Sequence, residues 1–109
     1  MEIVCDLDAS AVSLVDPEDL GRFSVRVIAP EGAGPGDAAR LGELLWRADA
    51  ARMNDGGDAL VSPDWVRTSA QGRVGADWEN GFAGMCAYAT SKGWIAEDGS
   101  IQAHVEWPA

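Results

Sequence analysis

Two carboxylates stand where an apolar segment ends, and they are the residues of this chain best placed to do chemistry. Asp6 directly follows the apolar run 3–5, and Asp8 stands two positions later. A carboxylate in such a place can attack a phosphorus atom, and its neighbour can protonate the leaving group. The pair therefore indicates one candidate activity, the hydrolysis of a phosphate ester.

The segment 3–10 resembles the first motif of the haloacid-dehalogenase-like phosphohydrolases. The resemblance implies that Asp6 is the nucleophile that becomes phosphorylated, that Asp8 is the general acid/base, and that Mg²⁺ screens both carboxylates. In that family Thr or Val usually stands where Ser10 stands here, the required lysine could only be Lys92, and the fold needs several parallel strands in a longer chain. The same residues fit a simple turn, since Asp and Ser favour turns, and we favour this second interpretation.

A glycine-rich stretch at 32–36 is the second candidate site, because it lies between an expected strand and an expected helix. Phosphate groups often bind at helix N-termini of this kind. The spacing here is Gly-x-Gly-x-Gly, however, Glu31 and Asp37 would repel phosphate, and there is no P-loop lysine. We therefore expect a connector that binds no nucleotide or other cofactor.

A binding surface is the third candidate. His104, the only histidine, is expected on the solvent-facing side of the last strand between Gln102 and Glu106. A catalytic role for it would need a nucleophile or carboxylate from elsewhere in the chain. Trp46 lies off the main leucine stripe of its expected helix, and Trp107 is near the end of the chain. Because tryptophan is enriched at binding hot spots, these five residues are our candidates for a surface that contacts a partner.

The net charge of the chain favours some classes of binding partner and opposes others. There are 18 acidic and 8 basic residues, which give a net charge of −10. This charge opposes binding to nucleic acid and to anionic membranes, because both need clustered Lys and Arg. We therefore expect a protein partner, and the charge favours a basic one. The sequence does not define the oligomeric state.

The chain shows no pattern of export or membrane insertion. Its apolar stretches fall short of the ~20 residues of a membrane span, and its first residues do not have the pattern of a signal peptide. The two cysteines, Cys5 and Cys86, are expected to be buried free thiols. Together with one histidine they cannot complete a zinc site without carboxylate help. We expect a cytoplasmic protein without a bound metal.

Alternation of apolar and polar side chains predicts strands in the first part of the chain, at 2–7, 11–15 and 23–27. Asp16 followed by proline predicts a single helical turn between the second and third of these strands. Proline and glycine residues then predict a loop at 30–36.

Three helices are expected in the middle of the chain. The first begins at Asp37 and runs to about Met53, with a leucine-rich stripe on one side. The second begins at Ser62, where a serine cap precedes a proline, and the third begins at Asp77. A short apolar link at 59–61 is a further strand candidate.

The last part of the chain is predicted to be this third helix followed by a β-hairpin. The helix stops at Gly93, the turn lies at 97–99, and side chains alternate along 101–107. Such alternation predicts a strand with one solvent-facing side. The main core is expected to include Trp78, Phe82, Met85 and Val105.

Together these patterns predict an α+β fold in which residues 1–109 form one domain. The expected architecture is an antiparallel sheet with about three helices packed on one face. The expected function is a non-catalytic protein-interaction module, of which a nuclease inhibitor or immunity-type protein is one case. The alternative is a Mg²⁺-dependent phosphohydrolase that uses Asp6 and Asp8.

Overall fold

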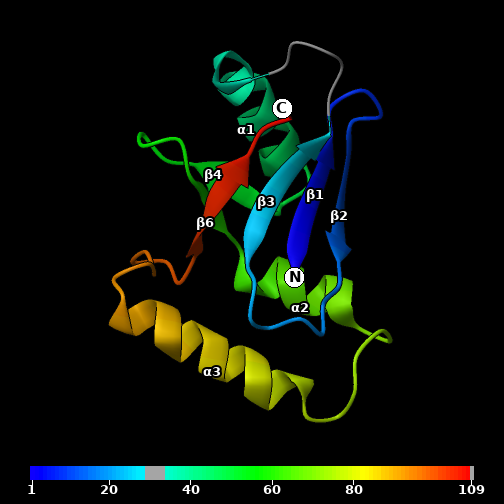
Figure 1. Cartoon of the computed structure of the whole chain (residues 1–109), viewed down its shortest axis with the longest axis vertical. Helices are drawn as coiled ribbons and strands as arrows, with labels where there is room; N and C mark the ends of the chain where they lie inside the picture. The colour runs from blue at the N-terminus through cyan, green and yellow to red at the C-terminus, as the bar shows by residue number, and fades with distance from the viewer. Residues whose placement is uncertain (29–33, 109) are drawn as a thin grey trace.

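The chain folds as a small α+β domain, shown in Figure 1. The computed structural model describes residues 1–28 and 34–108, so the predicted loop at 30–36 is described only from Gly34 onward. In chain order the elements are β1 (Glu2–Asp6), β2 (Ala11–Val15), β3 (Ser24–Ile28), η1 (Pro35–Asp37), α1 (Ala38–Arg47), β4 (Ala51–Met53), β5 (Ala59–Val61), α2 (Pro63–Ala70), α3 (Trp78–Ser91) and β6 (Ile101–Glu106).

The sheet is mixed, so the prediction of an antiparallel sheet was wrong in this respect. The strand order is β2-β1-β3-β6-β5-β4, and β3 is parallel to both β1 and β6, whereas the other pairs are antiparallel. Because β2 returns beside β1, the segment after β2 starts at the end where β1 starts. The chain therefore enters β3 in the same direction as β1.

One side of the sheet is buried and the other faces solvent, as the alternation predicted. In β6, for example, Val105 is buried and the neighbouring His104 and Glu106 are exposed. The solvent-facing side also carries an ion pair of 3.3 Å between Arg26 Nε and Glu2 Oε2. The strands contribute to one apolar core the buried side chains of Ile3, Cys5, Val25, Val27, Ala59, Val61, Ile101, Ala103 and Val105.

The helices do not all cover one face of the sheet. Leu41 and Leu45 of α1 and Val66 of α2 are buried in the same core as the strands. α3 also contributes Trp78 and Phe82 to this core, but it crosses the molecule beside the end of the sheet where the N-terminus lies (Figure 1). The predicted arrangement, with about three helices packed on one face of the sheet, is therefore confirmed only in part. Among the described helices, none is long and apolar enough to cross a membrane.

The first helix is shorter than predicted. It ends at Arg47, and Asp49 then adopts a left-handed backbone conformation with a φ of 57°. The chain leaves the helix there, and Ala51–Met53 becomes β4, which pairs with β5. The predicted end of the helix near Met53 was wrong, because alanine and methionine fit a helical stripe as well as a short strand. The predicted strand at 59–61 is confirmed.

The predicted core residues of α3 separate into two groups. Trp78 and Phe82 are buried and stacked, with ring centroids 4.9 Å apart and an angle of 7° between the planes. Met85 is only half-buried, because it lies toward a hollow between α3 and β6. Trp78 and Phe82 therefore anchor the helix, while the later turns of α3 contribute to a surface.

Both cysteines are free thiols. Burial raises the pKa of Cys5 to about 12, and burial also raises the pKa of Cys86. Because the thiolate is the reactive form of cysteine, these raised pKa values make both residues poor nucleophiles.

Candidate functional site

Asp6 holds the turn between β1 and β2. Its Oδ1 accepts hydrogen bonds from the backbone N–H groups of Asp8 and Ala9, both at 3.0 Å. Ser10 then takes a left-handed conformation with a φ of 52°, which brings the chain into β2. Backbone N–H groups thus occupy one oxygen of Asp6. Asp8 is exposed and lies in the same turn.

The lysine that the phosphohydrolase resemblance would need lies elsewhere. The Nζ of Lys92 lies 5.6 Å from the centre of the Tyr88 ring. Figure 1 shows α3 at the opposite end of the sheet from the carboxyl end of β1, which carries Asp6. In the described part of the chain, no group of three or more His, Cys, Asp and Glu side chains could hold a metal ion.

The predicted surface residues fall in different places. Trp46 on α1 is 68% exposed and lines a shallow hollow that it shares with Arg52 and Asp98. Trp107 is half-buried and packs against the core, whereas Glu106 is exposed at the end of β6. None of these three residues lines the hollow that contains Gln102 and His104, although Glu106 lies on the same side of β6 as they do. Their roles in binding stay predictions.

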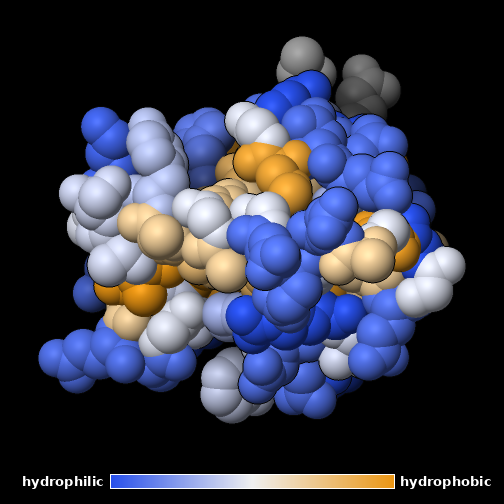
Figure 2. Space-filling view, turned by 90° about the horizontal axis from the view of Figure 1, so that it is seen from below, coloured by the Kyte–Doolittle hydropathy of each residue, from blue (hydrophilic) through white to orange (hydrophobic). Residues whose placement is uncertain are grey.

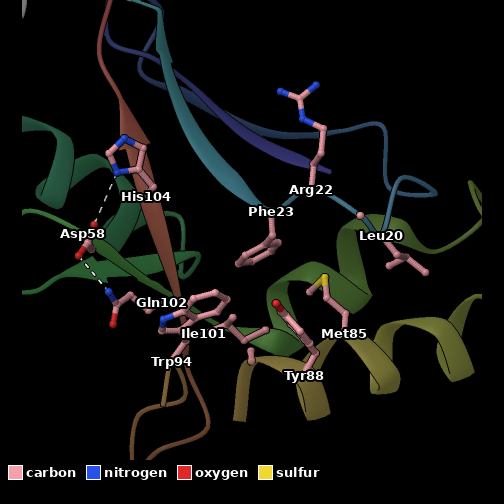
Figure 3. Close-up of a pocket in the computed structure, with 12 residues that line it drawn as sticks. Leu20, Arg22, Phe23, Asp58, Met85, Tyr88, Trp94, Ile101, Gln102 and His104 are labelled. Carbon is pink, nitrogen blue, oxygen red and sulfur yellow. Dashed lines mark hydrogen bonds and ion pairs between the residues drawn. The ribbon is translucent and has the colours of Figure 1, made fainter. Parts of the chain in front are cut away.

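Gln102 and His104 do share a hollow, which we call the α3–β6 groove (Figure 3). It has a volume of about 370 Å³. Three parts of the chain line it: the segment 20–23 before β3, the second half of α3 with Trp94, and the solvent-facing side of β6 with Asp58. The groove lies beside α3. Figure 2, which views the molecule from below, shows apolar patches that interrupt a hydrophilic surface.

Aromatic side chains form one wall of the groove. Tyr88 is 58% exposed and Trp94 is 43% exposed, and their rings meet edge to face with centroids 6.0 Å apart. Phe23 and Met85 point toward the same space (Figure 3). Large apolar side chains that remain this exposed and adjacent are typical of contact surfaces.

The end of α3 fixes the position of Trp94. Gly93 has a φ of 78°, the left-handed conformation that commonly ends a helix. The Trp94 N–H then donates to the Ala89 carbonyl at 2.9 Å, and the Trp94 carbonyl accepts from the Gln102 N–H at 2.7 Å. The backbone of Trp94 thus joins α3 to β6, so its ring is held at the mouth of the groove.

Asp58 provides the negative charge of the groove. Its Oδ2 accepts a hydrogen bond of 3.0 Å from Gln102 Nε2, and its Oδ1 lies 3.9 Å from His104 Nδ1. The turn before β5 holds its backbone, because Asn54 Oδ1 accepts from the Asp58 N–H at 2.9 Å and the Asn54 N–H donates to the Asp58 carbonyl at 2.9 Å. The side chain is 28% exposed, so the carboxylate is partly withdrawn from water.

The sequence reasoning missed Asp58, Tyr88 and Trp94 as site residues. The signal for Asp58 was the Asn-Asp-Gly-Gly-Asp turn, which we interpreted as a helix end. Interpreted as a hairpin turn, it would have predicted a strand at 51–53 that pairs with the strand candidate at 59–61, with Asp58 at the start of the latter. Because Leu60 pairs with Gln102, the same register places Asp58 opposite His104.

Arg22 is a cationic residue that also lines the groove. Its side chain points away from the other residues labelled in Figure 3. Chemically, the groove combines a partly buried carboxylate, an amide and exposed aromatic faces. That combination suits a cationic group with an apolar stem.

Comparison with protein-family models, with curated proteins and with solved structures gave no match.

Proposed function

We propose that this chain is a non-catalytic interaction module that binds a basic protein, and that the α3–β6 groove is its docking surface. The observation that carries the proposal is the partly buried carboxylate of Asp58 in the same groove as the exposed rings of Tyr88 and Trp94. Aromatic residues are common anchors of protein interfaces, and a partly buried carboxylate selects a positive partner.

The overall charge supports the choice of a basic partner. A net charge of −10 creates a negative field around the molecule. Such a field speeds the approach of a positive protein and repels acidic competitors. Because salt screens this attraction, the association rate should fall as ionic strength rises.

The size of the groove indicates an anchor point within a larger contact. A stable interface buries roughly 800 Å² on each partner. A hollow of about 370 Å³ has room for about one long side chain of the partner, so it forms only part of such an interface. Side chains around the rim must therefore contribute. The groove would take the central side chain of the partner, where most of the binding energy of an interface is concentrated.

A display screen tests this proposal directly, because it requires no named partner. Random 12-residue peptides are displayed on phage and selected on the purified wild-type protein. We expect the selected peptides to be rich in Arg and Lys and to lose binding to Trp94→Ala.

Trp46→Ala is the matched control, because it removes an exposed tryptophan that lies outside the groove. It should bind the selected peptides as the wild type does. Selection of neutral or acidic peptides, or loss of binding in Trp46→Ala but not in Trp94→Ala, would contradict the proposal.

The Mg²⁺-dependent phosphohydrolase that uses Asp6 and Asp8 remains the alternative prediction. The hydrogen bonds that Asp6 accepts in the turn give its carboxylate a structural role, so we favour the interaction module over the phosphohydrolase.

A further inference from the structure

We infer that the α3–β6 groove receives an arginine side chain of the partner, with the guanidinium paired to Asp58 and packed against the aromatic wall. This inference rests on the proposed function and specifies the chemistry of that same site.

The first support is the unused hydrogen-bonding capacity of Asp58. An ionised carboxylate has about four acceptor positions. Gln102 Nε2 occupies one of them on Oδ2, and His104 Nδ1 stands at 3.9 Å from Oδ1, beyond hydrogen-bond distance. In residues 1–28 and 34–108, no side-chain donor lies within hydrogen-bond distance of Oδ1. A ligand with a planar pair of N–H groups can therefore still bind this carboxylate.

The second support is the shape and lining of the groove. Its volume of about 370 Å³ is near the lower limit of the roughly 300–1,000 Å³ of small-molecule sites, so it suits one long side chain. Tyr88, Trp94 and Phe23 line the same groove as Asp58 (Figure 3). An arginine can lay its methylene stem along such a wall while its charged head reaches the carboxylate.

The third support is that the chemistry of the groove suits arginine better than lysine. The guanidinium is planar, stacks on aromatic rings, binds carboxylates in a fork geometry and is weakly hydrated. Lysine has a strongly hydrated point charge and gains less from a flat aromatic wall. The chain's own lysine in this region, Lys92, has its Nζ 5.6 Å from the Tyr88 ring, so a positive group already occupies one approach to that ring.

Nuclear magnetic resonance titration with small capped amino acids tests the inference. The probes are the Nα-acetyl amides of arginine, lysine and citrulline, the last being a neutral analogue of arginine with nearly the same shape. The readouts are the indole N–H signal of Trp94 and the side-chain amide signal of Gln102, with the Trp46 indole as an internal reference. We expect the arginine probe to shift the first two signals, the lysine probe to bind about tenfold more weakly, and citrulline to have no effect.

Asp58→Asn isolates the role of the charge, because asparagine keeps an acceptor for Gln102. Asp55→Asn is the matched control, since it removes the same charge from the same turn and Asp55 does not line the groove. Binding of the arginine probe should be lost in Asp58→Asn and kept in Asp55→Asn. If Asp58→Asn does not fold, His104→Lys replaces it: a permanent cation opposite Asp58 should compete with the probe and abolish the shifts.

The outcomes separate this inference from the proposed function. Equal binding of arginine and citrulline, equal binding of arginine and lysine, or no binding of arginine overturns the inference. The function still stands if basic peptides from the display screen require Trp94. If the screen selects no basic peptide, the proposed function fails whatever the probes do.

Discussion

The indole N–H of Trp78 donates a buried hydrogen bond of 2.6 Å to the carbonyl oxygen of Pro17, sixty-one residues earlier in the chain. This bond joins the start of α3 to the segment between β2 and β3. The same segment continues through Leu20 and Phe23, which line the α3–β6 groove opposite Tyr88. One hydrogen bond therefore helps to set the distance between two walls of the candidate site.

Trp78→Phe should destabilise the protein by about 1–3 kcal/mol, because it leaves a buried carbonyl without a donor. Phenylalanine keeps most of the stacking on Phe82, so the loss reports mainly the hydrogen bond. Urea unfolding followed by circular dichroism measures the change. Trp46→Phe is the control, since an exposed site should change by less than about 0.5 kcal/mol. Equal stability of the two variants would show that the bond contributes nothing.

Two glycines of α3 provide a matched pair of substitutions. A Cβ at position 84 meets open space, so Gly84→Ala should stabilise the helix by roughly 0.5–1 kcal/mol. A Cβ at position 81 would lie 2.5 Å from Leu20 Cδ1, so Gly81→Ala must displace a side chain that lines the groove. We expect Gly81→Ala to be less stable than Gly84→Ala and to weaken peptide binding. Thermal unfolding and the display-selected peptides check both effects, and identical behaviour of the two variants would argue against this packing.

Asp98 should make stability depend on pH in the acid range. A hydrogen bond from the Ser100 backbone, helped by the Ser100 hydroxyl and Arg52, lowers the pKa of Asp98 from 3.8 to about 2. Because the folded pKa is the lower one, the stabilisation is fully present above the unfolded value and is lost as the pH falls from about 4 to about 2. Urea midpoints of Asp98→Asn should thus be lower than wild type at pH 7 and approach it near pH 2. A constant difference across this range would contradict the assignment.

Substitutions of Asp6 distinguish a structural role in the turn from a role as a nucleophile. Asp6→Ala should cost about 1 kcal/mol, because the Asp8 and Ala9 N–H groups lose their acceptor, whereas Asp6→Asn should keep the turn. With an aryl phosphate and Mg²⁺, we expect phosphate release at the background rate from the wild type and from Asp6→Asn. Release by the wild type that Asp6→Asn abolishes would instead support the phosphohydrolase.

The local pattern of the sequence was sufficient for most elements. β1, β2, β3, α2, α3 and β6 lie near their predicted positions because alternation, caps and helix-ending glycines act over a few residues. The parallel pairing of β3 could not be predicted this way. Its partners, β1 and β6, come from opposite ends of the chain, and strand alternation is the same for either direction.

The candidate site was predicted only in part for a related reason. Gln102 and His104 were found because they alternate with apolar residues along one strand. Asp58 joins them only through the pairing of β5 with β6, which depends on the unexpected hairpin that begins after Asp49 leaves the helix. Trp94 was not singled out as a surface residue, because a large aromatic side chain is highly buried on average.

Calorimetric titration of a display-selected basic peptide into the wild type, Trp94→Ala and Trp46→Ala tests the central claim most directly. The account predicts that Trp94→Ala weakens binding at least about tenfold, as expected for an aromatic anchor, while Trp46→Ala binds as the wild type does. Unchanged affinity in Trp94→Ala would contradict the claim that the α3–β6 groove is the docking surface.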